Sequence, residues 1–253
     1  MRNVINAPQS WLTRSPKILV IGVGGTGSEV MSRLLKLNTL IERLDGLPLD
    51  VTVADGDTVS EFNIGRQNFY MCDIGENKAE VTVNRMNVFC NTQWKYIDQM
   101  INPSNIGNNK YDLVITCVDS GIFRAELGER FSDLDSQTLW LDGGNDNNSG
   151  QIIMGHLGRC KDKHPNLWDL FGDQLMENAG DDTPSCSSES AIAKQTFGIN
   201  SQIAEIMIQM LWQLLRTTML EKTISYVNLK TLDVSSVDAC PKQWALYGYT
   251  DVA

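Results

Sequence analysis

Short apolar runs alternate with amphipathic stretches along the first half of the chain, which is typical of βα units. Ile18–Ile21 is a run of four apolar residues that ends at Gly22, and it predicts a buried strand. Across Ser28–Leu44, apolar residues recur at helical spacing, and Gly46 and Pro48 follow. We therefore expect a strand, a glycine turn and a helix here.

The same alternation continues up to about residue 150. Further strands are expected at Asp50–Ala54, Trp94–Ile97, Tyr111–Val118 and Thr138–Asp142, with helices at Asn77–Cys90 and Phe123–Phe131. Gly143 and Gly144 should end the last of these strands. The pattern predicts an α/β fold with a doubly wound, Rossmann-like and mainly parallel sheet.

The pattern changes after Gly150. It predicts an antiparallel strand, an irregular segment, a strong amphipathic helix and a final strand, in that order: Gln151–Leu157, Arg159–Ser185, Ile199–Leu220 and Ser225–Val234. We expect a single domain, 1–253. Its parts are a nucleotide-binding part (17–150) and an antiparallel C-terminal extension for partner binding or dimerisation (151–253), with a mobile loop at 159–185.

Composition narrows the function classes. A net charge of −10 argues against non-specific binding of nucleic acid. The Ile199–Leu220 helix contains Glu205, Arg216 and several glutamines, so no membrane span is expected, and the first residues lack an apolar signal core. Six irregularly spaced cysteines, none in a Cys-x-x-Cys pair, indicate free thiols in a reducing cytosol. We therefore expect a cytoplasmic protein.

Four glycines follow the first strand within six positions: Gly22, Gly24, Gly25 and Gly27. Without Cβ atoms, the backbone N–H groups of such a turn can approach a phosphate closely. The helix that follows adds unpaired donors and a partial positive charge. A tight turn that binds nothing is the alternative. The flanking strand and helix favour a nucleotide phosphate site.

Polar side chains follow the second strand. Asp55 lies where Rossmann-type folds place an acid on the ribose hydroxyls, and Asp57 lies beside it. The alternative for Asp55 is a solvated aspartate at the end of a strand. Asn63 and Gln67 come next along the chain, in the same polar segment. These residues are candidates for nucleotide binding.

Two cations and a third acid complete the candidate site. Arg66 and Lys78 can neutralise phosphate charge, one as a planar fork and the other as a point charge. The alternative for Lys78 is an exposed position in the first turn of a helix. Asp119 ends the Tyr111–Val118 strand and Ser120 follows it. A carboxylate there can hold Mg²⁺ together with phosphate oxygens, whereas the alternative is a helix N-cap.

Taken in order, these motifs resemble the ThiF/MoeB/HesA family, the adenylating domains related to ubiquitin-activating enzymes. The resemblance rests on Gly-x-Gly-Gly-x-Gly, Asp-x-Asp-x-Val, Asn-x-x-Arg-Gln, Gly-x-x-Lys and a strand that ends in Asp, between Lys17 and about Gly150. The later segment Asp181–Ser187, with Gln195 and the pair Ile199-Asn200, is similar to the ThiF-like protein of PRTRC systems. These are bacterial mobile-element gene sets that also encode ubiquitin-like and conjugating-enzyme-like proteins.

The resemblance implies ATP-dependent adenylation of the C-terminal carboxylate of a ubiquitin-like protein, with transfer to a cysteine as a thioester. The roles it implies are phosphate contact by Gly24, Asn63 and Arg66, ribose binding by Asp55, a bridge to the α-phosphate by Lys78, Mg²⁺ binding by Asp119 and thioester formation by Cys186. The alternative for Cys186 is a buried or incidental cysteine. It further implies a homodimer in which an arginine near the N-terminus completes the partner's site, and Arg14 is the nearest candidate.

The chain departs from the family pattern at the zinc site, and two alternative functions also remain. The two Cys-x-x-Cys pairs that hold zinc in many relatives are absent from the sequence, and Cys160 with His164 makes only two ligands, so no zinc is expected. An NAD-dependent Rossmann oxidoreductase would share the glycine turn and Asp55, but it does not explain the later charged residues. A non-catalytic nucleotide-binding partner protein is the other alternative. The apolar residues on several sides of Ile199–Leu220 must be covered on more than one side, which favours a homodimer, and packing within the chain is the alternative.

Overall fold

The computed structural model describes residues 3–177 and 195–250. Its central strands are β2 (Lys17–Ile21), β3 (Asp50–Ala54), β4 (Lys95–Ile97), β5 (Leu113–Thr116), β6 (Leu139–Asn145), β7 (Ser149–His156), β9 (Lys222–Asn228) and β10 (Asp233–Asp238). Within the described residues they form one eight-stranded sheet in the order β10-β9-β7-β6-β5-β2-β3-β4. A separate two-stranded sheet pairs β1 (Ile5–Asn6) with β8 (Met219–Leu220).

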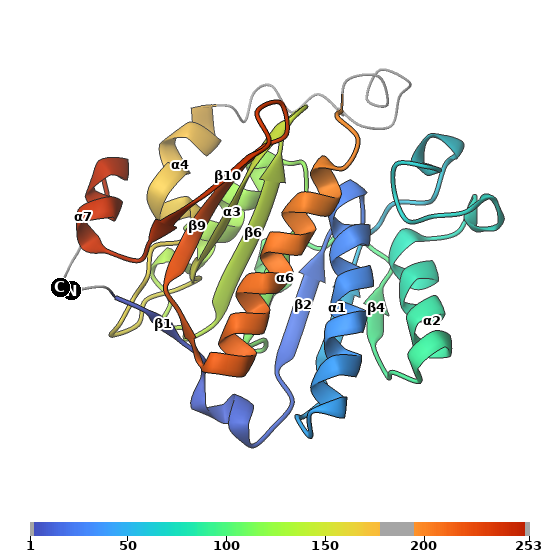
Figure 1. Ribbon diagram of the computed structural model, residues 1–253, viewed down its shortest axis with the longest axis horizontal. Coiled ribbons are helices and arrows are strands. Elements are labelled where there is room, and N and C mark those ends of the chain that lie inside the picture. The colour runs from blue at the N-terminus through green and yellow to red at the C-terminus, as the bar shows by residue number, and fades with distance from the viewer. Residues whose placement is uncertain (1–2, 178–194, 251–253) are drawn as a thin grey trace.

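The sheet has a parallel and an antiparallel part (Figure 1). Strands β4, β3, β2, β5 and β6 are parallel, whereas β7, β9 and β10 continue the sheet in antiparallel pairing. The predicted fold class, a mainly parallel α/β sheet with an antiparallel C-terminal extension, is confirmed. The chain crosses from β4 at one edge to β5 beside β2, so a crevice forms where the carboxyl ends of β2 and β5 diverge.

Helices cover both faces of the sheet (Figure 1). They are α1 (Gly25–Arg43), α2 (Lys78–Cys90), α3 (Gly121–Ser132), α4 (Leu167–Glu177), α6 (Ile199–Thr217) and α7 (Pro241–Trp244). Short 3-10 turns occur at Gln9–Leu12, Glu61–Asn63, Met71–Asp73, Pro103–Asn105 and Ala245–Tyr247. Helices α1, α2 and α6 pack on one face, and α3 and α4 pack on the other.

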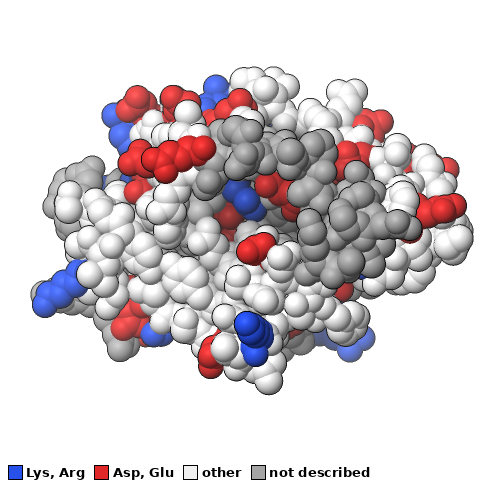
Figure 2. All heavy atoms as spheres, turned by 90° about the horizontal axis from the view of Figure 1, so that it is seen from above, with Lys and Arg blue, Asp and Glu red and all other residues white. Residues whose placement is uncertain are grey.

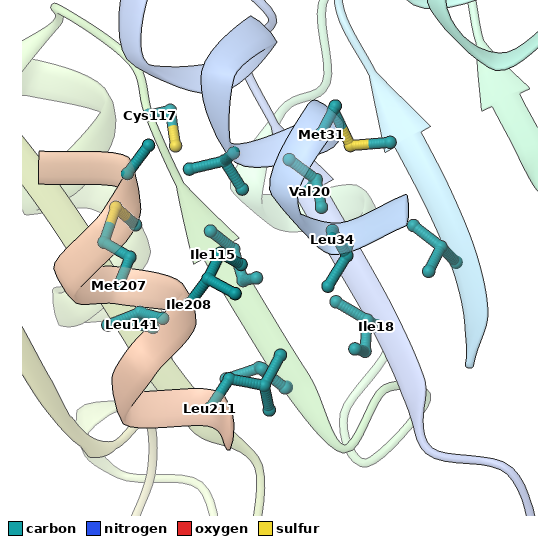
Figure 3. Close-up of a cluster of buried hydrophobic side chains, with 14 of the residues drawn as sticks. Ile18, Val20, Met31, Leu34, Ile115, Cys117, Leu141, Met207, Ile208 and Leu211 are labelled. Atoms are coloured by element: carbon teal, nitrogen blue, oxygen red, sulfur yellow. The ribbon is translucent and has the colours of Figure 1, made fainter. Parts of the chain in front are cut away.

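Alternating residues of each strand supply the two cores. Ile18 and Val20 of β2 point into the core under α1 and α6, whereas Leu19 and Ile21 belong to the core under α3 and α4. Figure 3 shows the first of these cores, where α6 lies across the sheet beside α1. The continuous apolar run of β2 is therefore explained by burial on both faces.

Several boundaries differ from those predicted. The strand that ends at Asp142 in the prediction continues through Gly143 to Asn145, because β7 pairs with it along that length. The Ser225–Val234 strand is wrong as a single element, since a turn separates β9 from β10. The irregular segment 159–185 contains α4, so the loop prediction is wrong there. Leu167 and Leu170 bury against α3, and this tertiary packing supports the helix.

Packing within the chain also explains the apolar faces of α6. Its residues Met207, Ile208 and Leu211 are buried against the sheet and α1. Ile206 and Trp212 are half-buried and pack on the same core. The helix is therefore covered on more than one side without a second copy of the chain, and it no longer supports the homodimer by itself. Among the described residues no helix combines the length and apolarity that crossing a membrane requires.

Candidate functional site

A cavity of about 750 Å³ lies at the carboxyl ends of β2, β3 and β5. Seen from above, the molecule is hollowed on this face and charged side chains of both signs lie in the hollow (Figure 2). Eleven of the sequence-predicted residues line the cavity: Gly22, Gly24, Gly25, Asp55, Asp57, Asn63, Arg66, Gln67, Lys78, Asp119 and Ser120. Residues distant in sequence thus meet at the crevice that the strand order creates.

The glycine turn shapes the floor of this cavity. Gly22 has φ +87°, a left-handed conformation that glycine adopts without strain. A Cβ at Gly27 would lie 1.9 Å from the carbonyl oxygen of Gly22, so the start of α1 packs tightly on the turn. At Gly24 the nearest atom to an added Cβ would be the amide nitrogen of Gln67, at 4.0 Å. Gly24 therefore leaves open space where a phosphate can approach the backbone.

Asp55 is buried and braces the turn. One of its carboxylate oxygens accepts a hydrogen bond from the backbone N–H of Val23 at 2.6 Å, and the other accepts from that of Asp57 at 2.8 Å. Burial raises the pKa of the Asp55 carboxyl, although these two N–H donors act to lower it. The alternative of a solvated strand-end aspartate is wrong, because this side chain ties β3 to the glycine turn.

Lys78 is buried although it begins helix α2. Its side chain is only 8% exposed, and its Nζ lies 2.9 Å from Asp57, whose side chain is 52% exposed. The preceding Asn77 caps the helix by accepting a hydrogen bond from the backbone of Glu80. An exposed position in the first helical turn, the alternative weighed for Lys78, is therefore wrong. The ammonium group reaches the cavity instead.

The segment after β3 brings three further polar residues to the wall. The side-chain oxygen of Asn63 accepts a hydrogen bond from the backbone N–H of Ser60 at 2.8 Å. Arg66 donates from Nη1 to the side-chain oxygen of Gln195 at 3.4 Å. Gln67 is 7% exposed, and its Oε1 has no hydrogen-bond partner within residues 3–177 and 195–250. An orphaned polar atom of this kind fits a cavity that receives a polar ligand.

Asp119 and Ser120 follow β5, where the sequence allowed either an Mg²⁺ ligand or a helix N-cap. Ser120 is the N-cap of α3, because its hydroxyl accepts from the backbone of Phe123 at 3.2 Å. Asp119 is exposed at the rim of the cavity. One carboxylate with phosphate oxygens and water is an ordinary donor set for Mg²⁺, so Asp119 fits that ion. Nowhere in the described part of the chain do three His, Cys, Asp or Glu side chains form a metal cluster.

Several cavity residues were not assigned a role from the sequence, and four of them are joined by hydrogen bonds. Thr26 of α1 donates to Asn145 at 3.1 Å and to Asn200 at 3.0 Å. Asn200 in turn donates to Gln195 at 3.1 Å. Gln195 and Asn200 belong to the segment that carried the narrower resemblance, and this was the one signal for them. Their contacts join residues about 130 to 170 positions apart, which no local pattern predicts.

Two further sequence candidates remain, Cys186 and Arg14. Cys186 falls outside the described residues. Arg14 forms two hydrogen bonds of 2.6 Å with Asp112, which immediately precedes β5, and is therefore at the edge opposite the cavity. This ion pair keeps Arg14 away from the cavity of its own chain, and a role in completing the partner's site stays a prediction. Cys160 is half-buried and its thiol pKa is raised to about 11, chiefly by burial, so its thiol is not activated.

Fold and cavity together define an α/β protein with a Rossmann-like glycine turn. The chain belongs to the ThiF family, whose model it matches over residues 1–244. It is 25% identical over 118 residues to the ATP-dependent ubiquitin transferase-like protein Cap2 of Enterobacter hormaechei subsp. hoffmannii (strain UCI 50). That match covers 44% of this chain and 18% of Cap2.

Solved structures share the fold. The crystal structure of PaaA matches with a TM-score of 0.60 and 15% identity, over 91% of this chain and 66% of PaaA. The crystal structure of E. coli MccB with succinimide matches with a TM-score of 0.61 and 14% identity, over 88% of this chain and 64% of MccB. This chain thus spans less than two thirds of the length of the proteins it matches.

Proposed function

We propose that this chain uses ATP to adenylate the C-terminal carboxylate of a ubiquitin-like protein. The observation that carries the proposal is the buried ammonium of Lys78, which shares one cavity with Arg66, Asp119 and the glycine turn. Two cations and an acid around a phosphate turn suit attack on a phosphate, whereas hydride transfer needs neither cation. Membership of the ThiF family and the likeness to Cap2 support the same chemistry.

The residues would divide the work as follows. Asp55 would hold the ribose through its carboxylate, and the N–H groups at Gly24 and Gly25 would contact phosphate. Lys78 would stabilise charge on the α-phosphate, and Arg66 would stabilise charge on the phosphates beyond it. Mg²⁺ bound by Asp119 would neutralise further phosphate charge. Asn63 and Gln67 would complete the phosphate contacts with their amide groups.

The reaction needs little covalent chemistry from the protein. A carboxylate oxygen of the acceptor forms a bond to the α-phosphorus, the bond from this phosphorus to the bridging oxygen breaks, and pyrophosphate leaves. The protein's task is to align the two reactants and to stabilise the transition-state charge. The proposed partners are the ubiquitin-like protein and a conjugating-enzyme-like protein of a PRTRC-type set, and the proposed assembly is a cytoplasmic homodimer.

Transfer of the acyl group to Cys186 is the second part of the proposal. The Cys186 sulfur would bond to the acyl carbon as the bond from that carbon to the AMP oxygen breaks, and AMP and the thiol proton would leave. Cys117 also lines the cavity, but it is buried and its thiol pKa is raised by that burial, so it is a poor nucleophile. Cys186→Ala should leave ATP–pyrophosphate exchange intact and abolish any reductant-sensitive conjugate with the ubiquitin-like protein. Retention of that conjugate would assign the thioester to another cysteine, and loss of exchange would make Cys186 structural.

Calorimetry tests the nucleotide, and exchange tests the reaction. We expect ATP with Mg²⁺ to bind at micromolar concentration and NAD to show no heat of binding. Radiolabelled pyrophosphate should enter ATP only when the acceptor protein is present. Binding of NAD in preference to ATP would replace the proposal with an oxidoreductase, and binding of ATP without exchange would indicate a non-catalytic member.

A further inference from the structure

A smaller cavity, of about 300 Å³, lies at the C-terminal end of α6. The segment that follows β1 passes this end of the helix, because β1 pairs with β8 and the backbone N–H of Ala7 donates to the carbonyl oxygen of Thr218 at 2.9 Å (Figure 1). Trp11 and Leu12 of that segment face Leu214 and Leu215 of the helix across the cavity. Within the described residues, this cavity shares no lining residue with the larger one at the carboxyl ends of the strands.

Trp11 brings a hydrogen-bond donor to the smaller cavity. The residue is only 8% exposed, and it lies in the 3-10 turn Gln9–Leu12, which begins after Pro8. Its indole Nε1–H has no hydrogen-bond partner in the part of the chain that the structure describes. An indole nitrogen can only donate, and a buried donor without a partner is destabilising. A molecule in the cavity that offers an acceptor would relieve this.

The other lining residues limit the chemistry of such a molecule. None of the described residues around the cavity is charged, so an ion would lose its hydration without gaining a partner. Leu214 is fully buried and forms an apolar wall, and Leu12 leaves 73% of its surface exposed at the rim. An apolar cavity of about 150 Å³ can hold benzene, so the volume here suits about ten to twelve non-hydrogen atoms.

We propose that this cavity binds a small neutral molecule with an apolar body and one oxygen acceptor. The body would pack on Leu214 and Leu215, and a carbonyl or hydroxyl oxygen would accept the hydrogen bond from Trp11 Nε1. The volume lies at the lower end of the range for small-molecule sites. Because the lining residues differ from those of the nucleotide site, this proposal can fail or succeed independently of the proposed adenylation.

Two probes of the same shape separate the indole donor from the apolar walls. Acetophenone carries a carbonyl oxygen where α-methylstyrene carries a CH₂ group. Each is titrated into isotopically labelled protein while the assigned Nε1–H signal of Trp11 is followed by NMR. Both rings perturb this signal alike, so the additional downfield shift with acetophenone reports the hydrogen bond. Benzoate, which is charged, should not bind.

Replacing Trp11 with phenylalanine keeps an aromatic ring and removes the donor. Trp11→Phe should weaken acetophenone about threefold to tenfold more than it weakens α-methylstyrene, which is the contribution of one neutral hydrogen bond. Trp212→Phe is the matched control, because Trp212 of α6 is half-buried, contacts Arg216 and lies outside the lining of the cavity. It should leave the affinity for both probes unchanged.

A third variant tests the cavity without removing the indole. Ala7 is half-buried in the lining, so Ala7→Leu should fill part of the cavity and abolish binding of both probes. This variant and the NMR shift in the parent protein decide the question if Trp11→Phe does not fold. Absence of binding by acetophenone at millimolar concentration, the same Trp11 shift with both probes, or parent-like binding in Ala7→Leu would overturn the proposal.

Discussion

Replacing Lys78 with methionine should separate catalysis from folding. Methionine retains the apolar stem of the buried side chain and removes the ammonium group. The lost ion pair is the contact with Asp57 at 2.9 Å, and that carboxylate is half-exposed and stays hydrated without its partner. Asp57 is thus left unpaired only in water. The buried Asp55 carboxyl loses the nearby Lys78 charge but keeps its two backbone N–H donors, so no buried charge is left without a partner, which is the usual reason why breaking an ion pair unfolds a protein.

The two expected magnitudes differ strongly. A pair in which one partner is half in water contributes less than about 1 kcal/mol to folding. For a chain of this size, that corresponds to a fall in melting temperature of about 2–4 °C. Loss of one preorganised charge donor in the transition state typically costs about 2.7–4 kcal/mol, a hundredfold to thousandfold fall in rate. Lys78→Met should thus fold normally and lose nearly all of its ATP–pyrophosphate exchange.

Exchange rates and melting curves are measured on the same preparations. Lys95→Met is the matched control, because Lys95 forms an exposed pair with Asp50, at 3.3 Å, at the amino ends of β3 and β4. It should leave exchange unchanged. Parent-like exchange in Lys78→Met would refute the reasoning. So would a loss of exchange that merely follows a large fall in melting temperature.

Three other predictions concern the rest of the site and the fold. Asp119→Asn should lose exchange and its dependence on Mg²⁺ together, measured as rate against Mg²⁺ concentration; full activity would leave no role for this carboxylate. Gly27→Ala should lower the free energy of unfolding in urea by about 1–3 kcal/mol or more, because the added Cβ would lie 1.9 Å from the backbone oxygen of Gly22. Gly107→Ala is the control, since its Cβ would meet no atom closer than 3.4 Å, and it should be tolerated. His156 has its pKa lowered from 6.5 to about 4 by burial, and its Nδ1 accepts from the backbone of His164. As the pH falls, His156 is protonated in the unfolded chain before it is protonated in the folded protein. The free energy of unfolding should therefore fall by about 3 kcal/mol between pH 6.5 and pH 4. A free energy of unfolding that does not change over this range, or the same pH dependence in His156→Gln, would contradict this.

The sequence was most informative where structure is decided locally. The strand at Ile18, the glycine turn and the α1 helix were all predicted, because apolar periodicity and missing Cβ atoms act over a few residues. Asp55 and Lys78 were correctly placed near the turn, but their burial was not predictable. It depends on β3 pairing with β2 and on α2 packing against β3, β4 and α1, which the local pattern does not report.

The parts that were missed depend on distant contacts. Asn200 and Gln195 reach the cavity only because α6 packs beside α1, and Asn200 contacts Thr26 across about 170 positions. Arg14 pairs with Asp112 across about 100 positions, a contact that the local pattern does not report, and its predicted role in the partner's site stays a prediction. Helix α4 lies in a segment whose polar composition predicts a loop, and burial of its leucines against α3 outweighs that composition.

The most direct test of the proposed reaction uses one acceptor in two chemical forms. The ubiquitin-like protein tested as the acceptor would be prepared with a free C-terminal carboxylate and, by semisynthesis, with a C-terminal amide. Each form is incubated with this protein, ATP, Mg²⁺ and radiolabelled pyrophosphate. Because the carboxylate oxygen is the proposed nucleophile, label should enter ATP with the carboxylate form and not with the amide. Equal exchange with both forms, or none with the carboxylate form while ATP is bound, would contradict the account.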